Sequence, residues 1–550
     1  METKEPLRWR RKAKFIDSPV ERVASLASFS RQNFSFYEIW DLPPEDRSLL
    51  FFRLMGIRCL KPIRNTEEFQ TLMLPAFKQV LHTNTTVLDL TGFVSFFPKL
   101  QRVALTRATI FRISDFAPNL KELIIKRDRD LREDPHNNYL SSDEEVLDAL
   151  CQLKKLIVLQ MEVLAFDLPD LLTLGKQLPK LKYLSTNVTK KIEMNSVKEL
   201  KMSFKQLKVF LFCSNADWEK RQALRRLIIK SLKQIQVVED FSSQLCATKD
   251  WFILPELGTP GESDLRHLTL DYDLGPKPAD LHLKYPRVTH LKIDWSEFGK
   301  CENNMLQMTT LLKFSHIQSL ELLYGVPIAF VYQLITKYGP NLLALDVADG
   351  RPEMDLTYNH IFYFCPKLEK LCLVGRGTEE KIDSFAQLKE LNLSLSFGCF
   401  GSNSPTLFNL LSAPDLKKLE LLGQFKDVED LRMLTSMIKT GRIFLNLENL
   451  VVNFNWFTLM KITAKKEIYF KQTVEFLFVA MNYLGKRLTQ IKFCLNDCTE
   501  YTQLARCLKE NATEKEMERI SSFYRGANSE NLGWIVNKDL IAMLEKRREE

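Results

Sequence analysis

Glycine and proline are scarce in this chain, which has 19 glycines and 22 prolines among 550 residues. Such counts exclude a low-complexity or linker-rich protein, because those classes are built largely from these two residues. No uninterrupted apolar run reaches the ~18 residues that a membrane-spanning helix needs. The first 15 residues are basic but lack the apolar core of a signal peptide. We therefore expect a folded protein of the cytoplasm, the nucleus or both, with no membrane partner.

Patterns for catalysis and cofactor binding are lacking too. The glycines stand apart, so no G-x-x-x-x-G-K-[ST] phosphate loop is present. None of the seven histidines belongs to an H-E-x-x-H pair, and the closest cysteines, Cys494 and Cys498, have no nearby histidine to complete a zinc set. We expect no enzyme, no metal and no cofactor. The 11 cysteines are predicted to be buried thiols in a reducing compartment.

Three histidines recur at similar places in three repeated phrases, His267, His290 and His316. Repetition could bring them near one another, although a metal or acid–base site also needs supporting groups around it. Histidines at strand edges, without a chemical role, are the favoured interpretation.

The net charge of +8 arises from 77 basic and 69 acidic residues and does not by itself call for nucleic acid. Residues 8–14 hold a basic cluster that could be a nuclear localisation signal or a polyanion contact. A solvated, disordered tail over 1–14 is the favoured interpretation.

At this length the chain should contain several domains or a repeat array. One phrase, Leu-x-x-Leu-x-Leu or a close variant, recurs. Its copies are separated by intervals such as Leu342 to Leu368 and Leu388 to Leu416, in or near the 20–29 residues typical of leucine-rich repeats. The clearest copies are FPKLQRVAL (97–105), APNLKELII (117–125), and the phrases that begin near residues 178, 285, 339, 365, 386, 413 and 445, with weaker ones near 153, 232, 265, 317 and 487.

The spacing within and between the phrases predicts alternating strands and helices. Leu-x-Leu places two leucines on one side of a strand. Segments 327–339, 405–413 and 428–441 have apolar residues at three- and four-residue spacing, as amphipathic helices do. A strand and a helix repeated about 13 to 16 times form a curved solenoid, in which each repeat buries the apolar face of its neighbour.

From about residue 87 to 493 the chain resembles intracellular, helix-containing leucine-rich-repeat proteins. The resemblance implies an α/β solenoid with parallel strands on the concave face, helices on the convex face and helical caps at both ends. The Asn or Cys that usually follows each strand is largely missing, as at Lys126 and Gly423, so we expect irregular repeats.

We predict four segments along the chain. A basic tail covers 1–14, and a helical N-terminal segment covers 15–82. The solenoid covers 83–498, with exposed insertions near 126–145 and 247–264. A helical cap and a charged tail cover 499–550.

The stretch LPPEDRSLLFFRL (42–54) precedes the repeats. It predicts a helix with prolines in its first turn and acidic residues near its positive end. It resembles the first half of an F-box, although the Trp of the second half is missing. The residues on the F-box positions and on the apolar face, which we predict to bind an adaptor, are Leu42, Pro43, Glu45, Leu49, Leu50, Phe51 and Leu54.

SPVERVASLASFS (18–30) is similar at comparable strength to the box of elongin-binding leucine-rich-repeat receptors. Both resemblances imply a non-catalytic substrate receptor of a cullin–RING ubiquitin ligase. Such a receptor would bind a Skp1-type or elongin-type adaptor and a cullin through its N-terminal helices, and a target protein through the repeats. The alternative for 15–82 is a plain solenoid cap, which any solenoid needs.

Two other functions stay open. The first is a leucine-rich-repeat scaffold with no ligase association. The second, which we disfavour, is RNA binding through the basic tail and outward residues such as Lys121, Lys126, Lys182, Lys201, Lys208, Arg266 and Lys292. Acidic neighbours at Glu122, Glu199 and Asp264 interrupt that basic track.

Overall fold

The computed structural model describes most of the repeat region. Described are residues 81–90, 94, 101–126, 140–141, 143–189, 197–214, 218–240, 263–271, 280–294, 309–323, 326–348, 356, 358–373, 385–394, 405–422, 428–453, 472, 475–476, 479–480, 483–484 and 490–494. No helix in these ranges is both long and apolar enough to cross a membrane.

The described strands form two parallel sheets, each ordered almost as in the chain. The first sheet runs β1-β2-β4-β5-β6-β7, with β3 beside β4. Its strands are β1 (Val87–Asp89), β2 (Glu122–Ile125), β3 (Leu140–Ser141), β4 (Val158–Phe166), β5 (Tyr183–Val188), β6 (Val209–Ser214) and β7 (Val237–Asp240). The second sheet contains β8 (His267–Asp271), β9 (His290–Asp294), β10 (Ser319–Leu323), β11 (Ala344–Ala348), β12 (Lys370–Leu373), β13 (Glu390–Ser394), β14 (Lys418–Leu422), β15 (Asn449–Asn453) and β16 (Gln490–Cys494).

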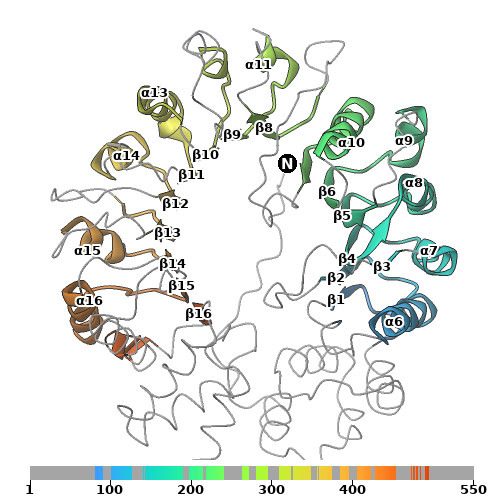
Figure 1. Ribbon diagram of the computed structural model, residues 1–550, viewed down its shortest axis with the longest axis horizontal. Coiled ribbons are helices and arrows are strands. Elements are labelled where there is room, and N and C mark those ends of the chain that lie inside the picture. The colour runs from blue at the N-terminus through green and yellow to red at the C-terminus, as the bar shows by residue number, and fades with distance from the viewer. Residues whose placement is uncertain are drawn as a thin grey trace, which may run out of the picture.

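Helices connect successive strands on the other side of the sheets. Figure 1 shows the strands along the inner side of an arch and the helices along its outer side. The helices are α6 (Arg102–Phe116), α7 (Glu144–Cys151), α8 (Leu168–Gln177), α9 (Val197–Ser203), α10 (Trp218–Ser231), α11 (Leu281–Lys284), α13 (Ile328–Tyr338), α14 (Tyr358–Phe364), α15 (Pro405–Leu411) and α16 (Val428–Lys439), with the 3-10 turn η6 (Gly339–Asn341) after α13. The predicted α/β leucine-rich-repeat solenoid is confirmed.

The core lies between the sheets and the helices. Alternate strand residues point into it, and the strand registers align them in rows from one repeat to the next. All members of one row are at most 2% exposed. They are Leu88, Leu123, Leu159, Leu184, Phe210 and Val238 in the first sheet, and Leu268, Leu291, Leu320, Leu345, Leu371, Leu391, Leu419 and Leu450 in the second.

Local sequence signals fix where individual helices begin and what they bury. Helix α8 begins with a capping box, in which the carboxylates of Asp167 and Asp170 each accept a hydrogen bond from the other's backbone N–H. Helix α13 buries Phe330, Val331 and Leu334 at the spacing of one helix face. The predicted helices at 327–339, 405–413 and 428–441 are confirmed as α13, α15 and α16.

One repeat phrase was interpreted wrongly. In FPKLQRVAL (97–105), residues 102–105 are the start of helix α6 and not a strand. The strand of that repeat is β1, which contributes Leu88 to the inward row. The end of the insertion near 126–145 forms β3 and the start of α7, whose N-cap is Asp143.

The two sheets adjoin at a seam between β7 and β8. No strand pairing is assigned there among the described residues, yet backbone hydrogen bonds cross it. Arg266 N donates to Gln236 O at 2.8 Å, and Asp264 N donates to Lys233 O at 3.0 Å. The solenoid is therefore continuous although the β ladder is interrupted.

Several predicted segments lie outside the described residues. They are the basic tail at 1–14, almost all of the N-terminal segment at 15–82, most of the insertions near 126–145 and 247–264, and the C-terminal segment at 499–550. The predictions made for these segments stay predictions.

Candidate functional site: the concave strand face

Two rows of strand side chains point away from the core, and together they form the concave face. The first row is Val87, Glu122, Val158, Tyr183, Val209 and Val237 in the first sheet, then His267, His290, Ser319, Ala344, Lys370, Glu390, Lys418 and Asn449 in the second. The second row is Asp89, Ile124, Gln160, Ser185, Leu211 and Glu239, then Thr269, Lys292, Glu321, Asp346, Cys372, Asn392, Glu420 and Val451.

The chemistry of these rows changes at the seam. In the first sheet the first row is mostly aliphatic, and Val158, Tyr183, Val209 and Val237 are each half-buried. Val87, at the start of the row, is 50% exposed. Apolar side chains that stay partly open to water are typical of surfaces that bind other proteins.

In the second sheet the rows are charged, and the charges pair with one another. Glu390 lies between two lysines, with its Oε2 3.9 Å from Lys370 Nζ and 3.7 Å from Lys418 Nζ. Asn392 Nδ2 donates to Glu420 Oε2 at 3.3 Å. Each exposed pair is worth about 1 kcal/mol or less, so their main effect is to neutralise this half of the face.

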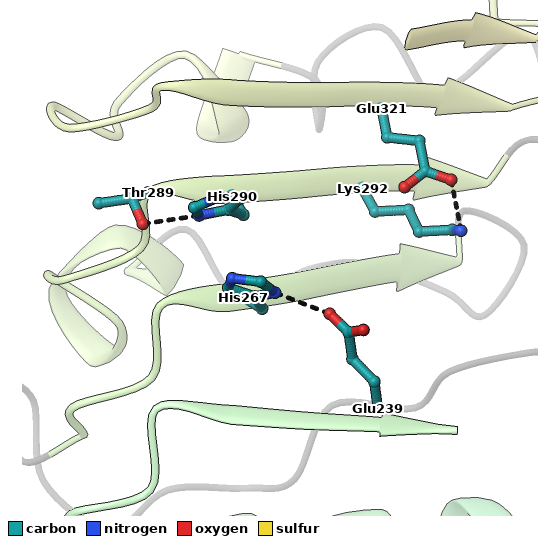
Figure 2. Close-up of polar contacts among 6 residues, drawn as sticks. All are labelled: Glu239, His267, Thr289, His290, Lys292 and Glu321. Carbon is teal, nitrogen blue, oxygen red and sulfur yellow. Dashed lines mark hydrogen bonds and ion pairs between the residues drawn. The ribbon is translucent and has the colours of Figure 1, made fainter. Parts of the chain in front are cut away.

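A group of polar residues lies at the seam itself, and we call Glu239, His267, Thr289, His290, Lys292 and Glu321 the seam cluster (Figure 2). His267 Nδ1 donates to Glu239 Oε1 at 2.7 Å, which joins the two sheets through their side chains. The rings of His267 and His290 stack with centroids 4.1 Å apart. His290 Nδ1 and Thr289 Oγ1 are hydrogen-bonded at 2.9 Å, and Lys292 Nζ lies 2.5 Å from Glu321 Oε1.

Burial and charge shift the pKa values of this cluster. The pKa of His290 falls to about 4, first because its ring is partly removed from water and second because the charge of His267 opposes protonation. Burial alone would raise the pKa of Glu239. The hydrogen bond and charge of His267, with Arg225 nearby, outweigh burial, so this pKa is lowered. Neutral His290 beside ionised Glu239 is therefore the state at neutral pH.

Two buried arginines of α10, Arg221 and Arg225, interact with acidic residues of β7 at the seam. Arg221 Nη1 lies 3.1 Å from Asp240 Oδ2, and the two side chains are only 9% and 6% exposed. Burial lowers the pKa of Arg225 to about 10, against the opposing charges of Glu239 and Asp240. These ions stabilise the last strand of the first sheet and face the core side rather than a partner.

The structure places two of the three recurring histidines together and shows four cysteines as free thiols. His267 and His290 are brought together, whereas His316 is exposed outside the cluster. Within the described ranges no group of three or more His, Cys, Asp or Glu is placed to hold a metal. Cys151, Cys213 and Cys365 are buried free thiols, as predicted, whereas the free thiol Cys372 is only half-buried on the concave face. Burial raises the pKa of Cys365 to about 12.

The predicted adaptor-binding residues cannot be placed in this way. Leu42, Pro43, Glu45, Leu49, Leu50, Phe51 and Leu54 all lie outside the described residues. Sequence reasoning also missed strand β6, whose inward positions are Phe210 and Phe212. The signal was present in LKVFLFC (207–213), because phenylalanine there occupies the leucine positions of the repeat phrase.

The sequence matches no protein-family model and no curated protein. Among solved structures, an internalin (inlF) from Listeria monocytogenes is 13% identical, with a TM-score of 0.26 over 68% of this chain and 89% of that chain. Rad7, in a complex of Rad7 and Elc1 in yeast, gives 15% identity and a TM-score of 0.31 over 76% and 90%. The Arabidopsis receptor kinase HAESA, in complex with the peptide hormone IDA and the co-receptor SERK1, gives 15% and 0.21 over 69% and 63%.

Proposed function

We propose that this chain is a non-catalytic binding protein whose concave strand face holds a protein partner. The observation that supports this most is the pair of outward rows, which continue from repeat to repeat through both sheets. A long, gently curved face of this kind can contact a large partner surface. The half-buried aliphatic row of the first sheet would supply its apolar contacts.

We further propose that residues 15–82 bind a ubiquitin-ligase adaptor of the Skp1 or elongin type together with a cullin. Support comes from the sequence LPPEDRSLLFFRL directly ahead of the repeats. Leu49, Leu50, Phe51 and Leu54 would enter an adaptor groove as one helix face. The repeats would then hold the target, and ubiquitin transfer would be accelerated by proximity rather than by a residue of this chain. Such a receptor works in the cytoplasm or nucleus, where free thiols persist.

Affinity purification of the tagged full chain under mild lysis, followed by mass spectrometry, tests both proposals. Val158→Glu with Val209→Glu places two charges on the aliphatic row and should remove the target. Lys176→Glu with Lys230→Glu, exposed near the ends of helices α8 and α10, is the matched control and should retain it. If the control and the concave-face variant recover the same proteins, the concave face is not the binding surface.

A second pair of substitutions separates the adaptor from the target. Leu50→Asp with Phe51→Asp should abolish recovery of the adaptor and cullin, retain the target and leave the thermal melt nearly unchanged. A collapse of the melt would mean that this helix is part of the core. Failure of the unmodified chain to recover any adaptor or cullin would leave a binding scaffold without ligase association, with 15–82 as a solenoid cap.

A further inference from the structure

One row of residues runs along the edge where the strands begin, directly beside the first outward row. Its members are linked across the solenoid by backbone hydrogen bonds. Ile157 N donates to Lys121 O at 2.7 Å, Lys208 N to Lys182 O at 2.8 Å and Gln236 N to Lys208 O at 2.7 Å. Further bonds at 2.9 and 2.8 Å complete the series Lys121, Ile157, Lys182, Lys208, Gln236 and Arg266.

Four members of this row are basic and none is acidic. We call Lys121, Lys182, Lys208 and Arg266 the basic ladder; all four side chains are exposed. Because adjacent strands lie about 4.8 Å apart, Lys182 and Lys208 occupy neighbouring positions at roughly that spacing. The turns that precede these strands add further exposed lysines along the same edge, Lys155, Lys180 and Lys205.

The ladder carries positive charge that the described part of the chain does not neutralise. Neither its four members nor the three turn lysines form an ion pair with another described residue. Of the acidic neighbours that interrupt the track in sequence, Asp264 is paired with Arg287 and Glu199 lies on helix α9. Only Glu122 stays next to the ladder.

Beyond Arg266, which precedes β8, the same row carries no net charge in the second sheet. There it contains Glu369, Lys389, Lys417 and Glu448, two residues of each sign. They pair with one another, with Lys389 Nζ 2.6 Å from Glu369 Oε1 and Lys417 Nζ 3.6 Å from Glu448 Oε1. The unneutralised basic row is therefore confined to the first sheet and the start of β8, and is not a property of the repeat itself.

From this juxtaposition we infer that the first half of the concave face binds an acidic protein segment that also carries apolar side chains. The inference rests on the proposed protein-binding function and specifies its partner. Acidic side chains of the segment would lie along the basic ladder. Its apolar side chains would lie on the adjacent aliphatic row, which includes Val158, Val209 and Val237.

The aliphatic row also distinguishes this partner from nucleic acid. A single-stranded nucleic acid binds by stacking its bases on aromatic side chains beside a basic groove. Among the described outward residues of the first sheet, Tyr183 is the one aromatic side chain, and its hydroxyl accepts a hydrogen bond from Gln160 at 2.9 Å. Aliphatic side chains next to lysines suit a peptide with apolar and acidic residues.

Fluorescence anisotropy with the purified full chain tests the inference. The probe is a labelled peptide of five Glu-Glu-Leu-Ala repeats, compared with Gln-Gln-Leu-Ala and Glu-Glu-Ser-Ser peptides of equal length and with a labelled poly-uridine RNA. The first peptide should bind best, and its affinity should fall as salt is raised, because exposed charges are screened. Equal binding of the two Leu-containing peptides, or no binding of the first at millimolar concentration, would overturn the inference.

Charge reversal locates the site. Lys182→Glu with Lys208→Glu should weaken binding of the acidic peptide by about tenfold or more, since it places like charges opposite each other. Lys389→Glu with Lys417→Glu, the same changes in the equivalent row of the second sheet, is the matched control and should leave the affinity within about twofold. Thermal melts check that both variants fold. An equal loss of affinity in both variants would show that net charge, and not the position of the lysines, determines binding, and it would overturn the assignment.

Two outcomes would overturn the acidic-partner inference without overturning the proposed protein-binding function. If the target recovered from cells depends on Val158 and Val209 but not on Lys182 and Lys208, protein binding stands and the acidic partner is wrong. If the RNA binds more tightly than the acidic peptide and loses affinity with the ladder variant, the ladder recognises phosphate and the acidic-peptide assignment is overturned.

Discussion

The two sheets of this solenoid share one backbone plan but differ in what they present to a partner. Their inward rows are interchangeable, with Leu123 in one sheet and Leu345 in the other equally buried. Their outward rows are not, because the first sheet offers aliphatic side chains with a basic edge whereas the second offers paired charges. Since core packing constrains only the inward residues, each half of the same fold is free to acquire its own surface chemistry.

The two halves also differ in how far their ion pairs are exposed to water. Most ion pairs of the second sheet are exposed on the concave face, where each is worth little. The first sheet holds one pair out of water, between Arg221 and Asp240 at the seam. Removing one member of such a pair leaves the other buried without that counter-charge, so the first sheet should depend more on a single carboxylate than the second does.

The largest expected effect follows directly from that difference. Asp240→Ala should lower the free energy of unfolding by about 3–5 kcal/mol, because the Arg221 guanidinium stays buried without its carboxylate. Glu390→Ala, which removes an exposed carboxylate between two lysines, should cost about 1 kcal/mol or less. Urea denaturation followed by circular dichroism measures both. Similar losses for the two variants would show that the seam pair is no more important than a surface pair.

Glycines at helix ends give a second comparison between the halves. A methyl group added at Gly339 would overlap the Phe364 carbonyl oxygen, a backbone atom fixed by the next repeat. At Gly175 the nearest atom belongs to the Phe204 ring, 2.8 Å away, and a side chain can shift more easily than backbone. Gly339→Ala should therefore cost about 1–3 kcal/mol.

Gly175→Ala should cost less, because alanine in helix α8 also recovers up to about 1 kcal/mol of helix propensity. Thermal melts of the two variants, measured side by side, provide the test. The reverse order of stabilities would mean that the helices of the second half are packed more loosely than their contacts indicate.

The solenoid could be predicted from sequence because its signal is local and repeated. A leucine phrase such as that around Leu342 specifies a buried strand without knowledge of the neighbouring repeats. The prediction failed where other residues took the same places: Phe210 and Phe212 replace leucines in β6, and the apolar run Val103–Leu105 at the start of α6 imitates a strand. Both errors arise because apolar side chains signal burial more reliably than they signal secondary structure.

The candidate site was less predictable because it depends on contacts between repeats. The recurrence of His267 and His290 in the repeated phrase indicates that they lie near each other, and the parallel register places them side by side. The pairing of Asp264 with Arg287 joins residues of two repeats and cannot be read from either one alone. Likewise, Lys121, Lys182 and Lys208 are far apart in sequence, and the hydrogen bonds between repeats align them along one edge of the fold.

The smallest expected effect is a pH dependence located at the seam between the two halves. The pKa of His290 is lowered to about 4 in the folded chain from its ordinary value near 6.5. The unfolded chain therefore binds more protons between these two values, so stability is complete above about pH 6.5 and declines as the pH falls toward 4. Because His290 is exposed to solvent, screening should limit its share to about 1 kcal/mol or less.

His290→Gln removes this titrating group while keeping a polar side chain beside His267. The loss of unfolding free energy between pH 7 and pH 5 should be smaller in this variant than in the unmodified chain, whereas His316→Gln, at an exposed histidine outside the seam cluster, should show the unmodified loss. Urea titrations at the two pH values measure the difference. Equal acid sensitivity in all three chains would place the main titrating groups elsewhere, and the seam would then be no more acid-sensitive than the halves that it joins.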